Sequence, residues 1–223
     1  MAELGRVRQN SYENYSEGQD RFARLNRRGE LVVVDFWTQC IFDGRTFIIQ
    51  VGTEDAPVDS TAAIDDTLAW ISADNTTGYA LIPTSCEITV ANWTTATLAQ
   101  AMIEVDRGKA RYSSGGTAYV PENLRTDRPR VAVGTFYVGT DITLAAKTAV
   151  PGSIELARNQ FSEDARATAE PGDFLGWRWS ARDRDTAVIV DVGNVNVQFG
   201  AATADVGGYG NLTFVQLPKE SMV

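Results

Sequence analysis

The feature that most constrains the fold of this chain is an alternation of apolar and polar residues with a period of two. It is clear at 86–90, where three apolar side chains share one face of an extended segment: Cys86, Ile88 and Val90. It recurs at 98–106, where Ala101, Ile103 and Val105 alternate with Gln100, Met102, Glu104 and Asp106. Such alternation is typical of half-buried β-strands.

Strand-like segments of this kind follow one another along most of the chain, with turn residues between them. We expect strands at 31–37, 46–51, 67–72, 79–85, 86–90, 98–106, 131–139, 153–156, 173–179, 187–199 and 212–217. Asp43-Gly44 between two apolar runs indicates a hairpin turn. Amphipathic helices are almost lacking, and no fixed-period repeat is visible. The pattern predicts an all-β sandwich or barrel rather than a βαβ architecture.

Several segments interrupt the alternation. The acidic segment 53–66, the polar segment 121–130, residues 158–173 and the glycine-rich segment 206–211 are expected to be loops. The apolar phase also changes at Gly193-Asn194, which indicates a β-bulge or a tight turn.

Residues 1–30 differ in composition from the rest and are predicted to form an extended N-terminal arm. They carry six arginines against five acidic residues, while residues 31–223 carry a net negative charge. They have too few apolar residues to form a core, so we expect the arm to order against a partner, with a short helix near 17–28. The remaining chain, 31–223, is expected to be a single β-sandwich domain.

The chain contains no histidine. Histidine is the commonest general acid-base residue near neutral pH and the commonest metal ligand, so its lack excludes Ser-His-Asp and Cys-His nucleophilic sites and histidine-ligated metal centres. Carboxylate chemistry, Ser-Lys or Thr nucleophiles and carboxylate-only sites for hard cations remain. We expect no catalytic, cofactor-binding or metal-binding residues, and therefore no enzyme.

Charge and hydropathy limit the partners. The formal charge of −9 repels phosphate backbones, so nucleic acid is not an expected partner. No stretch approaches 18 consecutive apolar residues, so a transmembrane helix is not expected. Cys40 and Cys86 are the two cysteines, and two buried thiols are favoured over one disulfide.

Several local motifs have both an ordinary structural explanation and a functional one. The acidic residues of 53–66 lack EF-hand spacing, so a solvated loop is favoured over a Ca²⁺ site. Trp177 and Trp179 alternate with Arg178, and their indoles are expected either in the core or on an interface or carbohydrate-binding face. The Arg-rich part of the arm forms either a solvated helix face or a surface that docks onto a negatively charged protein. Its candidate partner-binding residues are Arg21, Phe22, Arg24, Leu25, Arg27 and Arg28.

The order of motifs over residues 42–120 resembles a known family. Asp43-Gly44-Arg45-Thr46-Phe47 is followed by Val51-Gly52-Thr53, a loop with Pro57, a strand containing Trp70, and Thr77-Gly78-Tyr79-Ala80-Leu81-Ile82-Pro83. This order resembles jelly-roll virion proteins of tailed bacteriophages, particularly capsid decoration (cement) proteins. The resemblance implies a jelly-roll-like antiparallel β-sandwich that forms a homotrimer on the capsid exterior and contacts the major capsid protein. It implies no catalytic residues.

Three functions are compatible with these features. The first is a virion structural protein that decorates and stabilises a phage capsid. The second is a trimeric tail or fibre protein that binds a receptor through exposed aromatic residues at loop tips, with Trp93 and Tyr209 as candidates. The third is a carboxylate-based glycosidase, which needs two facing carboxylates in a cleft.

Overall fold

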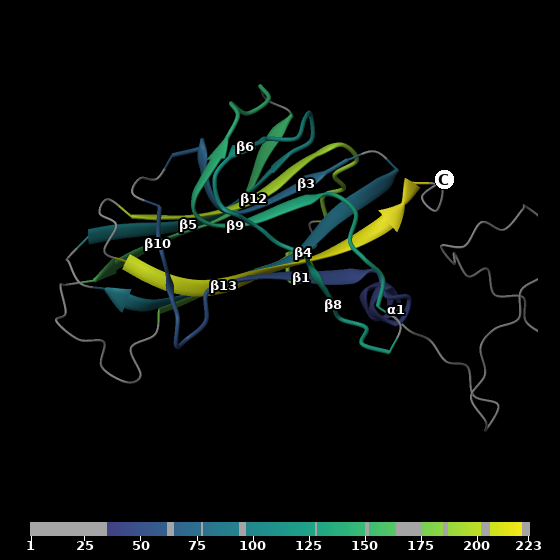
Figure 1. Cartoon of the computed structure of the whole chain (residues 1–223), viewed down its shortest axis with the longest axis horizontal. Coiled ribbons are helices and arrows are strands. Elements are labelled where there is room, and N and C mark those ends of the chain that lie inside the picture. The colour runs from purple at the N-terminus through teal and green to yellow at the C-terminus, as the bar shows by residue number, and fades with distance from the viewer. Residues whose placement is uncertain are drawn as a thin grey trace, which may run out of the picture.

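The computed structural model of the chain describes residues 35–61, 65–76, 78–93, 97–127, 129–149, 152–163, 175–184, 187–201 and 206–219. The N-terminal arm lies outside the described residues. The described chain is mostly β, which confirms the predicted fold class: two antiparallel sheets stacked as a sandwich, with one short helix beside them (Figure 1).

The first sheet has six strands. Its order is β11 (Leu175–Ser180), β4 (Tyr79–Trp93), β13 (Val206–Pro218), β1 (Thr46–Val51) and β8 (Glu122–Asn123), and β2 (Val58–Asp59) pairs with β13. Its main ladder joins β4 and β13, which pair from Tyr79↔Pro218 to Trp93↔Val206 with two register shifts.

The second sheet has seven strands. Its order is β10 (Ser153–Glu163), β5 (Thr97–Asp106), β12 (Gly193–Ala201), β3 (Leu68–Asn75), β9 (Thr135–Leu144) and β6 (Tyr112–Ser114), and β7 (Thr117–Ala118) pairs with β9. The strands β6, β7 and β9 extend this sheet beyond β3, and together they come from the chain between β5 and β10.

Eight of the long strands pair in a nested order. The first, β1, pairs with the last, β13; β3 pairs with β12, β4 with β11, and β5 with β10. Each pair belongs to one sheet, and successive pairs alternate between the two sheets. The chain is thus folded as one long hairpin that is wrapped around the core, so residues far apart in sequence become neighbours.

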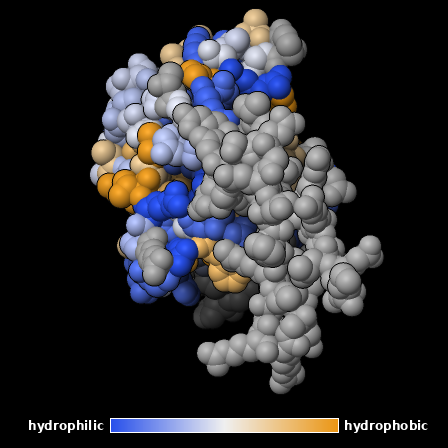
Figure 2. Space-filling view, turned by 90° about the vertical axis from the view of Figure 1, so that its right-hand side faces the viewer, coloured by the Kyte–Doolittle hydropathy of each residue, from blue (hydrophilic) through white to orange (hydrophobic). Residues whose placement is uncertain are grey.

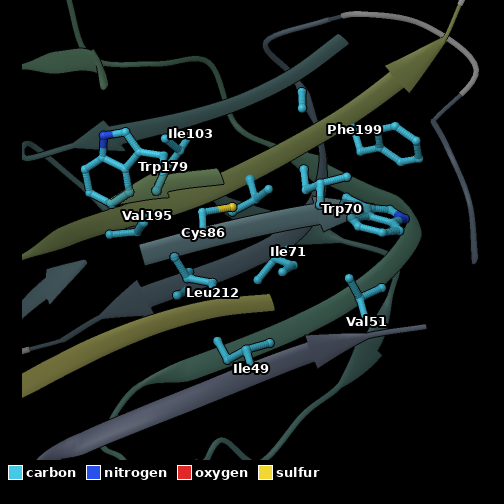
Figure 3. Packing of buried hydrophobic residues seen from close by; sticks show 14 of the residues in the cluster. Ile49, Val51, Trp70, Ile71, Cys86, Ile103, Trp179, Val195, Phe199 and Leu212 are labelled. Atoms are coloured by element: carbon cyan, nitrogen blue, oxygen red, sulfur yellow. The ribbon is translucent and has the colours of Figure 1, made fainter. Parts of the chain in front are cut away.

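The core fills the space between the sheets, as the period-two pattern predicts. Phe47, Ile49 and Val51 of β1 are all buried, as expected for one face of a strand. They meet side chains from both sheets in a single cluster, in which Trp70 and Phe199 lie with their ring centroids 4.9 Å apart (Figure 3). Burial of aromatic and branched side chains is the main source of stability here, about 1.5–3 kcal/mol for each fully buried one.

The helix α1 (Phe36–Phe42) corrects two predictions from the sequence. The expected strand at 31–37 is wrong for its described residues, and Asp43-Gly44 ends the helix instead of forming a hairpin. Asp35 begins the helix, because its carboxylate accepts hydrogen bonds from the backbone N–H groups of Trp37 and Thr38. The β-branched run before this cap favoured a strand, but the cap determines the local structure.

Several strand boundaries also differ from expectation. The glycine-rich segment 206–211 is part of β13, and residues 158–163 continue β10, so neither is a loop. Residues 79–85 and 86–90 form one strand, β4, and the strand expected at 131–139 begins only at Thr135. The apolar phase changes at Gly193, which is the first residue of β12. Residues 187–192 were expected to belong to the same strand, but within them only Val190 pairs, in an isolated bridge.

Close packing explains why a glycine-rich segment forms a strand. A Cβ atom on Gly210 would lie 2.4 Å from the carbonyl oxygen of Glu87 and 3.2 Å from Cζ3 of Trp70. The glycine therefore lets β13 approach β4 and leaves room for the indole. Sequence composition alone does not distinguish such a glycine from one in a loop.

The cysteines and the paired tryptophans have structural roles. Cys40 and Cys86 are buried free thiols, as predicted. Trp179 is buried in the core, and Trp177 is half-buried and packs against the same cluster. Burial in the core, one of the two predicted alternatives, is therefore confirmed for Trp179.

Candidate functional site

The outer face of the seven-stranded sheet carries a polar cluster that we call the polar ladder. Because side chains alternate along a strand, the residues between those of the core point to this face. They are Ser72 and Asp74 of β3, Gln100, Glu104 and Asp106 of β5, and Asn194, Asn196 and Gln198 of β12. All of them are buried.

Hydrogen bonds run across the ladder from strand to strand. Asn194 Nδ2 donates to Ser72 Oγ (3.0 Å) and to Asp74 Oδ1 (2.7 Å). Asn196 Nδ2 donates to Asn194 Oδ1 at 2.9 Å, which continues the network along β12. Asp74 also accepts from the backbone N–H groups of Arg111 and Tyr112. Pairing of this kind offsets the cost of burying polar groups.

An ion pair lies at the end of this network. Arg111 Nη1 donates to Glu104 Oε2 at 2.9 Å, and both side chains are almost fully buried. The same guanidinium donates from Nε to the carbonyl of Ala145 and from Nη2 to the carbonyl of Asp66. Arg111 thereby joins the loop before β3 and the segment after β9 to the sheet.

Beside this ion pair the surface is hollowed into a pocket of about 500 Å³, here called the polar pocket. Lys147 Nζ lies 3.1 Å from Asp66 Oδ2 and 3.5 Å from Glu104 Oε1. Ser153 Oγ donates to Glu104 Oε1 at 2.6 Å. The pocket is lined by Asp65, Asp66, Met102, Glu104, Lys147, Thr148, Ala149, Ser153, Glu155, Arg158 and Gln198.

The charges in the polar pocket are paired with one another. Arg158 Nη2 lies 2.7 Å from Glu155 Oε2, and this hydrogen bond holds the pKa of Glu155 below its ordinary value. The hydrogen bond from Lys147 to Asp66 raises the pKa of Lys147. Asp65 accepts from the N–H and the hydroxyl of Thr67, which lower the pKa of Asp65.

These pKa shifts indicate what the polar pocket can do. A glycosidase acid is a carboxyl group whose pKa is raised so that it holds a proton to donate. Glu155 and Asp65 are shifted in the opposite direction, and Glu104 and Asp66 have cationic partners. The arrangement therefore suits hydrogen bonding to a polar ligand better than proton transfer.

A second hollow, which we call the arginine pocket, lies at the other sheet, where β1 begins. It has a volume of about 90 Å³. Arg45 is 6% exposed, and Arg130 beside it is exposed. Gly44, Phe47, Tyr79, Val131, Gln216 and Pro218 complete the lining.

Several exposed apolar residues lie on α1 and on the segment 124–133, which also carries Arg130 and Val131 of the arginine pocket. Phe42 of α1 is 55% exposed and Val131 is 76% exposed, with Ile41, Leu124 and Val133 also on the surface. Hydrogen bonds connect the segments that carry them, from Leu124 to Thr46, from Arg125 to Phe42 and from Val133 to Gln216. We call this surface the α1–β8 face. Figure 2 views the end of the molecule that includes α1 and shows apolar surface beside strongly hydrophilic surface.

The residues predicted from sequence to bind a partner lie outside the described part of the chain. They are Arg21, Phe22, Arg24, Leu25, Arg27 and Arg28, so their role stays a prediction. The first described residue, Asp35, caps α1. Of the aromatic residues expected at loop tips, Tyr209 is half-buried within β13, and Trp93 is the last residue of β4.

The alternation at 98–106 correctly places Gln100, Glu104 and Asp106 on the face opposite the core, but it does not predict the polar ladder. The alternation of Asn194, Asn196 and Gln198 with Val195, Val197 and Phe199 was the available signal. The contributions of Arg111, Lys147 and Arg158 were not recognisable, because these residues are brought to the ladder from three separate segments.

Comparisons with protein-family models, with curated proteins and with solved structures each find no match to this chain. In the described part of the chain, no group of three or more Cys, Asp or Glu is placed to hold a metal ion. The helix found there is too short to cross a membrane.

Proposed function

We propose that this chain is a virion structural protein that decorates and stabilises a bacteriophage capsid, binding the major capsid protein as a homotrimer on the capsid exterior. The observation that carries the proposal is the nested pairing of β1 with β13, β3 with β12, β4 with β11 and β5 with β10. This order supports assignment of the sandwich as a jelly roll, an architecture found in viral capsid proteins, lectins and cupins.

The residue content argues against the cupin class and against hydrolytic activity. Cupin metal centres depend on histidine ligands, and the chain has no histidine. The carboxylates of the polar pocket are paired with cations or hydrogen-bond donors, which favours a binding or structural role over hydrolysis. The resemblance of residues 42–120 to capsid decoration proteins agrees with the strand order.

The α1–β8 face supplies a surface for protein contact. Exposed apolar residues that gather in one area are typical of interaction sites, and Phe42, Leu124 and Val131 are all exposed on this face. A decoration protein contacts a shell at many equivalent positions. Weak contacts by each copy are therefore sufficient, because a trimer engages several of them at once and gains avidity of about 10²–10⁴-fold.

The arm provides the second contact. Its arginines Arg21, Arg24, Arg27 and Arg28 are predicted to dock onto a negatively charged area of the capsid protein, with Phe22 and Leu25 inserting between them. An arm that orders on binding adds contact area without enlarging the folded domain.

The test mixes the purified protein with capsids of the virus that encodes it, prepared without this gene, and measures cosedimentation. The full chain should bind to saturation at a fixed ratio to the capsid protein, and native mass spectrometry should give three times the chain mass of 24.3 kDa. A variant lacking residues 1–28 should keep its far-UV circular dichroism but lose binding. Failure of the full chain to bind would overturn the proposed function.

Two matched variants separate charge from folding in the arm. Replacing Arg21, Arg24, Arg27 and Arg28 by Gln should abolish cosedimentation, whereas Arg178→Gln, a change on the opposite edge strand β11, should leave it unchanged. Normal binding by both the truncated and the Gln variants would rule out the arm as the capsid contact, while leaving decoration itself supported.

A second candidate function is a trimeric tail or fibre protein that binds a host glycan. The polar pocket favours it, because paired Arg, Glu and amide groups are suited to hydrogen bonding with sugar hydroxyls. A glycan array with the wild-type protein and with Arg158→Ala distinguishes the two functions. Binding to a defined glycan that Arg158→Ala abolishes would favour the adhesin.

A further inference from the structure

A buried amide lines the polar pocket and keeps part of its hydrogen-bonding capacity free. Gln198 lies on the outer face of β12 and is 5% exposed. Its Nε2 donates to Asn196 Oδ1 at 3.3 Å, and no group among the described residues donates to its Oε1. Buried polar groups are normally hydrogen-bonded. A ligand in the polar pocket can therefore complete the hydrogen bonding of Gln198.

The other polar groups of the lining are set to accept hydrogen bonds. Ser153 Oγ donates its only proton to Glu104 Oε1 at 2.6 Å, so this oxygen can only accept a further bond. The ionised carboxylates have no proton to donate. Arg158 directs Nη1 to Gln100 Oε1 at 3.1 Å, and its Nε and Nη2 donate to Glu155. A ligand that fits this lining must supply donors.

The charge of the lining disfavours both anions and cations. Four carboxylates face two cations in the pocket, namely Asp65, Asp66, Glu104 and Glu155 against Lys147 and Arg158. Arg111, which pairs with Glu104 from behind, leaves a net charge of −1 from four acidic and three basic groups, so an anion is repelled. Lys147 Nζ already lies between Asp66 and Glu104, where a ligand's ammonium group would otherwise bind. The lining therefore favours a neutral donor, which is the chemistry of a hydroxyl group.

The size and floor of the polar pocket agree with a ligand rich in hydroxyl groups. Its volume of about 500 Å³ lies within the range of small-molecule sites. Met102 is 6% exposed and offers apolar contact at the floor, and Ala149 does so at the wall. A carbon ring or chain that carries several hydroxyl groups presents C–H surface and O–H donors together.

We propose that the polar pocket binds a neutral polyhydroxyl compound, a hexose or an acyclic polyol, through Gln198, Ser153 and the carboxylates beside them. The site discriminates against acidic and amino sugars because of its charges. The inference deepens the second candidate function and rests on it only for the origin of the sugar as a host glycan. It is independent of capsid decoration.

The binding test uses the full chain. The side-chain amide resonances of Gln198 are followed by NMR during titration with D-glucose, D-galactose, D-mannose and glycerol, and at least one compound should shift them saturably. The matching acid, a uronate or glycerate, and the matching amine should each bind about tenfold more weakly or less. Glycerol binding as tightly as the best hexose would assign the site to acyclic polyols, and weaker binding of glycerol would assign it to sugar rings.

Variants locate the binding. Gln198→Leu nearly keeps the side-chain volume but removes the amide, so it should weaken binding about tenfold. Gln160→Leu is the matched control, because Gln160 is exposed on β10 outside the pocket lining, and it should bind as the wild type does. Ser153→Ala removes the second acceptor, should also weaken binding, and replaces Gln198→Leu as the test if circular dichroism shows that Gln198→Leu is unfolded.

Three outcomes would overturn the proposal. The first is the lack of a saturable shift with all four neutral compounds. The second is equal affinity for the neutral compound and its matching acid, because the charge of the lining would then play no part. The third is unchanged affinity of both Gln198→Leu and Ser153→Ala, which would place the binding outside the polar pocket.

Capsid cosedimentation separates this proposal from the proposed function. Gln198→Leu should lose the sugar but bind capsids as the wild type does, because decoration uses the arm and the α1–β8 face. If the wild type binds capsids but none of the neutral compounds, the polyhydroxyl site is wrong and decoration stands. If it binds a neutral compound but no capsids, decoration is wrong and the polyhydroxyl site stands.

Discussion

Arg111 and Glu104 form an ion pair in which Nη1 and Oε2 are 2.9 Å apart and the side chains are 0% and 3% exposed. Arg111 directly precedes β6, and Glu104 lies in β5. Glu104 belongs to the polar ladder and also lines the polar pocket.

Loss of one charge from this pair is expected to be costly. Glu104→Gln leaves Arg111 buried without its counter-charge, so the free energy of unfolding should fall by about 3 kcal/mol. Glu87→Gln is the matched control, because Glu87 and its partner Arg178 are 46% and 67% exposed, and it should change stability by less than about 1 kcal/mol. Urea denaturation at neutral pH measures both. Equal losses would show that burial does not distinguish the pairs.

The close approach of β13 to β4 predicts that Gly210 does not accept a side chain. Gly210→Ala places Cβ 2.4 Å from the carbonyl oxygen of Glu87, and the resulting backbone shift should cost about 2 kcal/mol. Gly176 in β11 has no atom within 4 Å of its added Cβ, so Gly176→Ala is the control. Thermal unfolding of the two variants gives the comparison, and a Gly210→Ala protein as stable as Gly176→Ala would contradict the packing of β13.

Asp106 is expected to contribute to acid sensitivity. Burial opposes its ionisation, but the N–H groups of Thr148 and Gly108 donate to it at 2.7 and 2.8 Å, and its pKa is lowered from the ordinary 3.8. A lowered folded-state pKa stabilises the protein above 3.8, and this stability is lost as the pH falls through the lower value. Asp106→Asn should cost about 1–3 kcal/mol near neutrality.

The pH dependence itself supplies the test of that assignment. Urea midpoints measured between about pH 5 and pH 2 should fall less steeply for Asp106→Asn than for the wild type, because the linked protonation is gone. Asp65 and Glu155, whose pKa values are also lowered, remain in both proteins. Parallel pH profiles would therefore mean that Asp106 is not a source of acid sensitivity.

The thiols should be unreactive in the folded protein. Burial raises the pKa of Cys40 to about 12 and also raises the pKa of Cys86. Ellman's reagent should detect no thiol in the native protein and two in denaturant, because only the thiolate reacts. Cys40 packs in a small cluster with Ile82, Val215 and Leu217, so it should become reactive at a lower urea concentration than Cys86. Rapid reaction in the native state would contradict this burial.

Local sequence patterns predict the structure correctly where the preference of a segment agrees with its environment in the folded protein. The alternation in β1 correctly predicts that Phe47, Ile49 and Val51 face the core, and the same rule places Glu104 and Asp106 on the opposite face. The rule is wrong at 36–42, where a capping aspartate starts a helix in a β-branched context, and at 206–211, where glycines serve close packing inside a strand.

Of the candidate sites, only the ladder residues had a recognisable signal in the sequence. The arginine pocket had none, because Arg45 and Arg130 are 85 positions apart in the printed sequence and Asn123, which joins them, reads as an ordinary loop residue. Lys147 and Asp66 of the polar pocket are also far apart in the sequence, and nothing in the sequence indicates that they meet. Contacts between distant segments depend on which strands pair, and periodicity carries no information about partners.

By itself, the sequence determined that this protein is all-β and that histidine chemistry is excluded, because period-two burial and residue types are local properties. Only the tertiary structure decided that β1 pairs with β13 and β3 with β12, and that the polar face of β5 and β12 is buried instead of solvated. Strand pairing and the cover of a sheet face are set by the free energy of packing the whole chain, to which residues far apart in sequence contribute jointly.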